Sequence, residues 1–451
     1  MTPGTYYIET YGCQMNVHDS EIMSSLMESI DFSLTTDEKT ADVVIINTCA
    51  IRGKSQHKVY SALGRFRQTR KNNPNLVIVV AGCVAQQERE ALLKKSELVD
   101  LVLGTHQIVE LPVMVEKIRR ERVRITKTDF SRDVQSLGIK GVHPKKNQVC
   151  SFLTIMQGCS NFCSYCVVPF TRGPEQSRPL DEILEEAHWL VSNGIKEITL
   201  LGQNVNAYGL DLGSRGAGFC TLLESLNNII GLQRIRFTTS HPKDFDENVI
   251  DAMASMDKVC EHIHLPIQSG SDSILESMRR KYTKSEYFSK IEALRDKLPG
   301  AAITTDIIVG FPGETEQDFR DTISTLDQIK YDQIFSFKYS VRPRTAAETF
   351  PDHVSEDIKK DRLAQVHELQ DKITSEYHKS MEASTVEVLV EKDPSGPSGQ
   401  ASGRTRTNKI VNFESPITDL VGLTVKVRIL EGLKHSLRGK LLQESLNKKS
   451  I

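Results

Sequence analysis

The chain reads QGCSNFCSYC from Gln157 to Cys166, directly after an apolar stretch, Phe152–Met156, that predicts a β-strand. Three cysteines within eight residues can converge on one face of a four-iron cluster, because thiolates are the usual ligands of such clusters. A closed structural zinc site commonly takes four ligands, and no fourth Cys or His lies nearby. The spacing of Cys159, Cys163 and Cys166 therefore favours an iron–sulfur cluster over zinc, with one iron left open for a co-substrate.

The segment around this motif, residues 149–375, repeats a strand–helix pattern about six times. We expect strands near Phe152–Met156, Glu197–Leu201, Arg234–Thr238, His262–Ile267, Thr304–Val309 and Ile334–Tyr339. Six such units predict an open or partial (β/α)6 barrel, since the closed form needs eight. Ligand sites of parallel α/β folds lie at the carboxyl ends of the strands, where the three cysteines are expected.

A second set of cysteines shares one context in residues 4–120. Cys13, Cys49 and Cys83 each follow a predicted strand, at Tyr6–Glu9, Val43–Ile46 and Val77–Ala81 respectively, and each precedes a helical stretch. Strands that alternate with helices predict a parallel α/β domain. In one parallel sheet the three thiols would meet at the same edge and form a second three-ligand site. Free buried cysteines in an α/β core are the structural alternative.

The end of the chain changes character. Residues 378–446 read as short strands around a Pro/Gly/Ser loop at 393–399, which predicts a small all-β barrel of OB-like type. From His378 onward there are 12 Lys and Arg against 8 Asp and Glu, whereas the whole chain has a net charge of −2. A basic domain on an acidic body is typical of RNA binding, and equally of a solvated surface. Residues 121–148 are basic and polar and are expected to form a linker.

Composition sets the remaining limits. A length of 451 residues suggests about three domains, and 39% hydrophobic residues are ordinary for a globular protein. Nine cysteines, an odd number, do not suggest a disulfide framework. No apolar run approaches the ~20 residues that span a bilayer, and the N-terminus has no signal-peptide pattern. We therefore expect a cytoplasmic protein without membrane contact.

The CxxxCxxC motif with Tyr165 before its last cysteine resembles the radical-SAM superfamily. That resemblance implies that S-adenosylmethionine chelates the open iron of a [4Fe-4S] cluster and is cleaved to a 5′-deoxyadenosyl radical. Two three-cysteine sets followed by a small β-domain resemble, over nearly the whole chain, the methylthiotransferases. The quoted blocks are YGCQMN at 11–16, NTCAIR at 47–52 and AGC at 81–83, and the last domain is similar to a TRAM domain, an RNA-binding barrel.

Four further blocks resemble the members of this family that modify isopentenylated adenosine in tRNA. They are CVVPFTRG at 166–173, LGQNVNAYG at 201–209, HLPIQSGS at 264–271 and DIIVGFPGET at 306–315. The resemblance implies replacement of the hydrogen on carbon 2 of N(6)-isopentenyladenosine at position 37 of tRNA by a methylthio group. It also implies two [4Fe-4S] clusters, two molecules of S-adenosylmethionine, an electron donor and the anticodon stem-loop as partner. The base is expected to leave the loop so that its reacting atom can enter a pocket.

Beyond the six cysteines, the expected site residues are of two kinds, and no further catalytic residue is expected. Contacts to S-adenosylmethionine are expected from Tyr165, Gln203, Asn204 and Gln268. The family's usual GGE-like motif is replaced by Gly202-Gln203-Asn204, which a simple turn also explains. RNA contacts are expected from Arg172, Arg404, Arg406, Lys434 and Arg438, although Arg172 fits a structural ion pair equally well.

Two other functions remain open at this point. Within the class, the substrate could be threonylcarbamoyl-adenosine in tRNA or an aspartate of a ribosomal protein. Outside it, the chain could be a non-catalytic iron–sulfur protein that binds RNA or transfers electrons. A pure electron carrier would normally hold each cluster with four thiolates, whereas both sites here have three.

Overall fold

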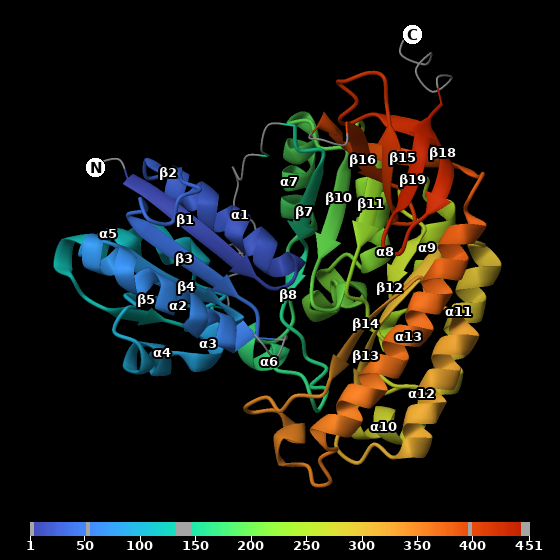
Figure 1. The fold of residues 1–451 in the computed structure, drawn as a ribbon, viewed down its shortest axis with the longest axis horizontal. Coiled ribbons are helices and arrows are strands. Elements are labelled where there is room, and N and C mark those ends of the chain that lie inside the picture. Colours follow the sequence, from blue (N-terminus) through green and yellow to red (C-terminus); the bar gives the residue numbers. More distant parts are fainter. Residues whose placement is uncertain (1–3, 51–54, 132–143, 145–146, 396–398, 443–451) are drawn as a thin grey trace.

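The computed structural model describes residues 4–50, 55–131, 144, 147–395 and 399–442. Figure 1 shows an N-terminal α/β domain, a central α/β domain and a C-terminal β-barrel, as the sequence predicts. Most of the expected linker, residues 132–143 and 145–146, lies outside the described residues.

The N-terminal domain contains one parallel six-stranded sheet with the order β2-β1-β3-β4-β5-β6. Its strands are β1 Gly4–Tyr11, β2 Phe32–Leu34, β3 Val43–Thr48, β4 Val77–Gly82, β5 Leu101–Leu103 and β6 Ile125–Lys127. Its helices are α1 Gln14–Glu28, α2 Ser55–Asn72, α3 Cys83–Glu88, α4 Glu90–Lys95 and α5 Leu111–Glu121. The central strands β3 and β4 are buried at every position, which explains why they read as unbroken apolar runs in the sequence.

The central domain contains all six predicted strands as two parallel sheets of three, ordered β11-β10-β7 and β12-β13-β14. An isolated bridge between Ile235 and Val259 connects the two. The strands are β7 Cys150–Thr154, β10 Glu197–Leu201, β11 Arg234–Phe237, β12 His262–His264, β13 Ala302–Val309 and β14 Gln333–Lys338, and β8 Met156–Gln157 pairs with β9 Gln176–Ser177. The helices are α6 Val168–Thr171, α7 Leu180–Ser192, α8 Phe219–Asn227, α9 Glu247–Ser255, α10 Asp272–Ser277, α11 Lys284–Lys297, α12 Glu316–Ile329 and α13 Glu356–Ser380.

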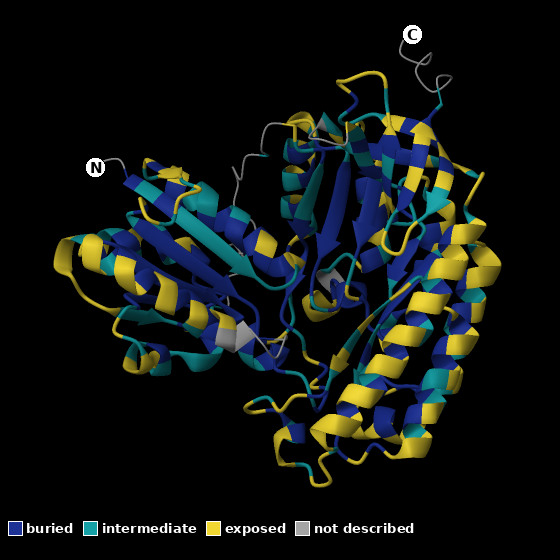
Figure 2. Ribbon diagram, in the orientation of Figure 1, coloured by how far each residue is buried: buried dark blue, intermediate teal, exposed yellow. Residues whose placement is uncertain are grey.

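Side chains alternate between the two faces of these strands. Ile198, Ile235, Ile263 and Ile307 pack with the helices in the main core. The adjacent residue on each strand must therefore face the barrel interior. Examples are Thr199, Arg236, His264 and Asp306. Figure 2 shows the helices exposed along their outer surface and buried against the strands. The inner face is consequently polar, unlike a core built only for packing.

The C-terminal domain is a closed barrel with the order β15-β16-β17-β19-β18. Its strands are β15 Thr385–Ser395, β16 Gln400–Arg404, β17 Ile410–Glu414, β18 Thr424–Gly432 and β19 Leu437–Leu441. The segment after β16 docks on the amino ends of the central strands, where the guanidinium of Arg234 donates to the carbonyl of Arg404 at 2.7 Å. The barrel therefore lies at the end of the central domain opposite the cysteine loop.

None of the helices in the described residues is long and apolar enough to cross a membrane.

Candidate active site

The central cysteine loop follows the carboxyl end of β7 and β8, as expected. Its backbone is held by hydrogen bonds from Cys159 N to Gly173 O at 3.1 Å and from Cys166 N to Cys163 O at 3.0 Å. Burial raises the pKa of Cys166 to about 12, and the neighbouring thiols of Cys163 and Cys159 add to the rise. Cys163 also raises the pKa of Cys159, after burial, so the three thiols lie near one another.

A buried arginine lies against this loop. The Arg280 guanidinium donates to the Cys163 sulfur at 3.4 Å, to the Tyr165 hydroxyl at 3.4 Å and to the carbonyl of Pro266 at 2.8 Å. Burial opposes the charge on Arg280, but the neighbouring Tyr165 and Cys163 help to hold its pKa well above the ordinary value. Arg280 is therefore a cation placed beside Cys163, one of the three expected cluster ligands, and a sequence motif limited to the cysteines does not reveal it.

The three N-terminal cysteines also meet. Cys13 follows β1, Cys49 follows β3 and Cys83 follows β4, three neighbouring strands of the sheet. A hydrogen bond with Cys49 lowers the pKa of Cys13 to about 6, and the nearby charge of Arg172 acts in the same direction against the effect of burial. The pKa of Cys83 is raised by burial, while Arg172 counteracts that rise. These interactions indicate that Cys13 lies near both Cys49 and Cys83 at this edge of the sheet.

One glycine and two asparagines pack closely around these thiols. A Cβ on Gly12 would come within 2.7 Å of the Cys49 Cβ, so only glycine lets the first two cysteines approach. The Asn16 carboxamide oxygen lies 3.3 Å from the Cys13 sulfur, and the Asn16 amide donates to Asn47 at 3.1 Å. Both asparagines lie in the quoted cysteine blocks, but spacing alone gave no reason to single them out.

Among the described residues, no three Cys, His, Asp or Glu side chains are close enough to bind one metal ion. A four-iron cluster needs wider spacing, because each thiolate binds a different iron. The donor sets, three thiols each, fit such clusters better than mononuclear zinc.

Arg172 joins the two cysteine sites. Its side chain is buried and donates to the Asp19 carboxylate at 2.5 Å and 3.3 Å. Asp19 belongs to α1, which begins beside Cys13, whereas Arg172 ends the helix that follows Cys166. This placement argues against the RNA contact expected for Arg172, because the ion pair occupies its guanidinium in the domain interface.

The residues expected to contact S-adenosylmethionine differ in their placement. Gln203 accepts a hydrogen bond from Gly158 N at 2.5 Å, which steadies the cysteine loop. Asn204 is occupied at both ends, by the carboxylate of Asp244 at 2.7 Å and by His241 N at 3.1 Å. Tyr165 packs beside a small core cluster, and its hydroxyl accepts from Arg280. Of these four residues, only Gln268 keeps a buried side-chain oxygen for which the described part of the chain offers no partner.

Other buried polar atoms near the strand ends share this property. Within the described residues no partner is found for either side-chain polar atom of Asn206, for the Ser240 hydroxyl or for the His241 Nε2. The His241 Nδ1 accepts from Lys243 N at 3.2 Å, so its Nε2 carries the proton and is a free donor. Buried polar groups normally have partners. Asn206, Ser240, His241 and Gln268 therefore suit a polar ligand such as S-adenosylmethionine, and sequence reasoning named only the last.

The basic residues of the C-terminal barrel fall into two groups. Arg406 binds both carboxylate oxygens of Glu261 at 2.6–3.0 Å, and Arg404 pairs with Glu391 at 3.2 Å. Arg406 holds the domain interface, which argues against the RNA contact expected there. Lys434 and Arg438 are exposed, with surface ion pairs to Asp371 and Glu431 respectively.

The outer face of β18 and β19 carries further cations, and sequence reasoning missed Lys426 and Arg428 among them. Arg428 and Lys440 are paired across the two strands, and both are exposed together with Lys426. Lys426 and Arg428 alternate with the buried Val425 and Val427, so the period of two in the sequence could have identified them.

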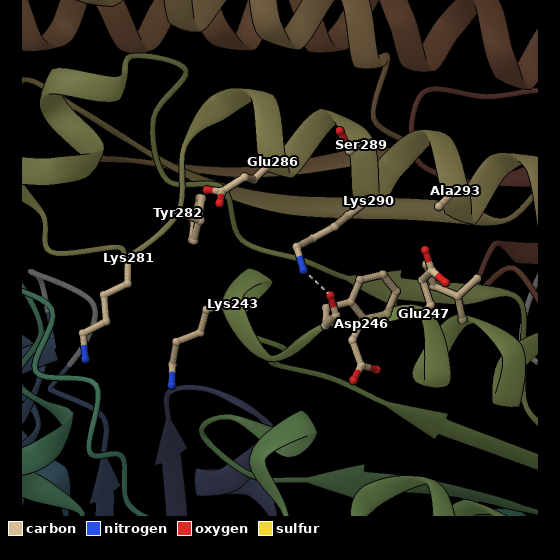
Figure 3. A pocket seen from close by; sticks show the side chains of 11 residues that line it. Lys243, Asp246, Glu247, Lys281, Tyr282, Glu286, Ser289, Lys290 and Ala293 are labelled. Atoms are coloured by element: carbon tan, nitrogen blue, oxygen red, sulfur yellow. Dashed lines mark hydrogen bonds between the residues drawn. The ribbon is translucent and has the colours of Figure 1, made fainter.

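A separate pocket of about 440 Å³ lies beside α9 and α11. Figure 3 shows Lys243 and Lys281 projecting in the same direction, while Lys290 donates to the carbonyl of Phe245 at 2.5 Å. Lys243 follows β11, and Lys281 follows α10 at the same end of the barrel as the cysteine loop. Both lysines are exposed, and Lys243 pairs with the Asp244 carboxylate at 3.2 Å.

Three family models match the chain. Residues 5–104 match the uncharacterized protein family UPF0004, residues 153–326 match the radical SAM superfamily, and residues 379–442 match the TRAM domain.

Curated relatives match over nearly the full length. A tRNA-2-methylthio-N(6)-dimethylallyladenosine synthase of Syntrophus aciditrophicus is 48% identical over 98% of this chain and 95% of its own. The protein of the same name from Carboxydothermus hydrogenoformans is 45% identical over 98% of this chain and 100% of its own.

Solved structures share the fold at low identity. A radical S-adenosylmethionine methyltransferase from Kitasatospora setae, with cobalamin and a [4Fe-4S] cluster bound, has a TM-score of 0.55 at 15% identity and covers 77% of both chains. A cobalamin-dependent S-adenosylmethionine radical enzyme has a TM-score of 0.53 at 11% identity, over 82% of this chain and 56% of the other.

Proposed function

The chain belongs to the family of tRNA-2-methylthio-N(6)-dimethylallyladenosine synthases, and we propose that it methylthiolates carbon 2 of N(6)-isopentenyladenosine at position 37 of tRNA. One observation carries the proposal: two separate sets of three cysteines are brought to the carboxyl ends of two neighbouring sheets. A reaction that needs a radical and a sulfur atom requires two such sites.

The central site is that of a radical SAM enzyme. Cys159, Cys163 and Cys166 hold its iron–sulfur cluster, and Asn206, Ser240, His241 and Gln268 offer polar atoms to S-adenosylmethionine. When bound, this cofactor pair supplies a carbon radical that can act on an aromatic C–H bond. The protein positions the reactants and excludes water, because the cofactor carries the difficult chemistry. Arg280 contributes a fixed cation beside Cys163.

We assign the second [4Fe-4S] cluster, the source of sulfur, to Cys13, Cys49 and Cys83. Two features support this assignment: the contact of Cys13 with Cys49, and the buried charge of Arg172 beside Cys13 and Cys83. A cation near thiolates stabilises their ionised form, which is the form that binds iron.

We assign RNA binding to the C-terminal domain, expected at residues 378–446, and to the exposed lysines Lys243 and Lys281 of the central domain. The partner we propose is the anticodon stem-loop that carries the isopentenylated base, and the reaction also requires an external electron donor. Phosphates are bound by Lys and Arg side chains, and Lys426, Arg428, Lys440, Lys243 and Lys281 are exposed.

The test is mass spectrometry of tRNA nucleosides from a strain without the gene, complemented with wild-type or variant protein. Wild type should restore the methylthio derivative, whereas Ala at Cys13, Cys49 and Cys83 together should leave isopentenyladenosine to accumulate. Cys220→Ala is the matched control, because this cysteine lies outside both sets. Loss of a threonylcarbamoyl derivative instead would contradict the proposed substrate.

A further inference from the structure

Two exposed aromatic rings stand on the inner face of the central domain. Phe335 and Phe337 are 39% and 36% exposed and alternate along the edge strand β14. The residue between Gln333 and Phe335, Ile334, packs against the helix-covered core. Because neighbouring side chains on a strand point to opposite faces, both phenylalanines face the barrel interior. Aromatic rings exposed side by side in a lumen cost free energy unless a ligand covers them.

A polar pair lies beside the first ring. Asp306 is opposite Phe335 in the strand register, and the His264 ring meets the Phe335 ring edge-on at 5.7 Å. The His264 Nε2 lies 3.5 Å from the Asp306 carboxylate, and its Nδ1 lies 3.0 Å from the Thr304 hydroxyl. The Asp306 carboxylate remains partly exposed. The face thus combines a flat apolar surface with a hydrogen-bond acceptor.

The N-terminal cysteine set lies against the segments on both sides of this face. On one side, Gln14, the neighbour of Cys13, accepts a hydrogen bond at 3.3 Å from Thr238, which follows β11. On the other side, the chain that leaves β14 reaches Arg342, where burial lowers the pKa of the guanidinium and the nearby Cys49 partly opposes that fall. A ligand bound on this face would therefore lie beside the site of Cys13, Cys49 and Cys83.

We infer that His264, Asp306, Phe335 and Phe337 form the binding face for the target purine base of the RNA. The inference rests on the proposed function. A purine stacks on an aromatic ring, its N(6)–H can donate to Asp306, and an isoprenoid chain can cover the second ring. The backbone of Gln268 is hydrogen-bonded to β13, the strand of Asp306, through Asp306 O at 2.9 Å and Ile308 N at 3.0 Å. The side chain proposed to contact S-adenosylmethionine therefore lies next to the proposed binding face.

S-adenosylmethionine also contains an adenine, so the two purines must be distinguished. The unpartnered atoms of Asn206, Ser240 and His241 follow β10 and β11, whereas the aromatic face belongs to β14, the edge strand of the other sheet. This separation favours the RNA base at Phe335.

The experiment is a double-mutant cycle with the full-length, anaerobically reconstituted enzyme. Phe335→Ala and wild type are titrated with an anticodon stem-loop carrying isopentenyladenine and with the same RNA abasic at that position. Phe335→Ala should weaken binding of the first RNA about tenfold, the effect of losing about 1.4 kcal/mol, and should leave binding of the abasic RNA unchanged. Ile230→Ala is the control, because Ile230 is 93% exposed and lies outside this face. It should change the affinity for neither RNA.

Three results would overturn the inference. They are an equal loss for both RNAs, no loss for either, and a tenfold loss of S-adenosylmethionine affinity, which would assign the ring to the cofactor. Phe335→Leu, which keeps apolar bulk but removes the aromatic face, gives the same test if the Ala variant does not fold. Wild-type product formation is measured first. If wild type makes no methylthiolated product, the proposed function fails, whereas a failed cycle with an active wild type affects only the binding face.

Discussion

The buried ion pair between Arg172 and Asp19 yields a prediction that can be tested by stability alone. Both side chains are almost inaccessible, at 3% and 7% exposure. Replacing Arg172 by Met would leave the Asp19 charge buried without its partner. Breaking a buried pair in this way costs about 3–5 kcal/mol, because the remaining ion has lost its solvation and its counter-charge. For a cooperative unit of about 150–250 residues, this corresponds to a fall in Tm of about 6–20 °C.

The assay is differential scanning calorimetry of the anaerobic protein, with two matched variants. Arg320→Met removes an exposed i,i+4 pair with Glu316 and should cost about 0.3–0.5 kcal/mol. The double variant Arg172→Met with Asp19→Asn removes both buried charges and should recover most of the lost stability. If Arg172→Met melts together with Arg320→Met, the buried pair does not connect the domains as argued.

Four further predictions follow from the same structure. The reconstituted enzyme should hold about eight irons; Ala substitution of either cysteine triplet should remove about half in an iron assay, and bound zinc without iron would contradict both sites. Ala at Cys13, Cys49 and Cys83 should leave cleavage of S-adenosylmethionine to 5′-deoxyadenosine intact but abolish methylthiolation, both measured by chromatography; loss of cleavage in a variant that retains the central cluster would refute this division. Charge reversal at Arg428 and Lys440 should reduce the log–log salt slope of tRNA binding by about two units without changing the melting temperature. Arg406→Glu should instead lower the melting temperature. The opposite pattern would mean that Arg406 lies on the RNA-binding face and that Arg428 and Lys440 lie in the domain interface. Burial raises the pKa of Glu314 from 4.5 to about 7 although Arg362 opposes the rise, so between these pH values the folded chain keeps a proton that the unfolded chain has lost. The free energy of unfolding should therefore fall as the pH rises from about 4.5 to 7. Urea unfolding of Glu314→Gln should show a flatter dependence on pH than wild type.

The parts of the fold that sequence predicts are those with a local signal. The buried strands β3 and β4 are long apolar runs, and each cysteine of the N-terminal set follows such a run or begins the next helix. The strands β2, β5 and β6 have three residues each, too few to show a period, and all three were missed. The helical stretch expected after the third of these cysteines is two helices, α3 and α4, because Arg89 has a positive φ of 50° and interrupts it.

The parts of the site that sequence does not predict depend on contacts between distant segments. Asp19 is 153 residues before Arg172, and no local pattern connects them. Arg404 and Arg406 carry the charge expected of RNA-binding residues, but composition does not say which face of a small barrel docks on another domain. The inward orientation of Phe335 follows from alternation only once the neighbouring strands are known.

The N-terminal cysteine site depends on the central domain. A cluster held by three thiolates is negatively charged, and burying that charge is costly without a nearby cation. The N-terminal domain supplies the thiols, but the cations found beside them, Arg172 near Cys13 and Cys83 and Arg342 near Cys49, come from the central domain. Docking of the two domains therefore stabilises the N-terminal site at the same time as it places that site over the barrel. It follows that an isolated N-terminal domain should hold the proposed second cluster less tightly than the full chain does.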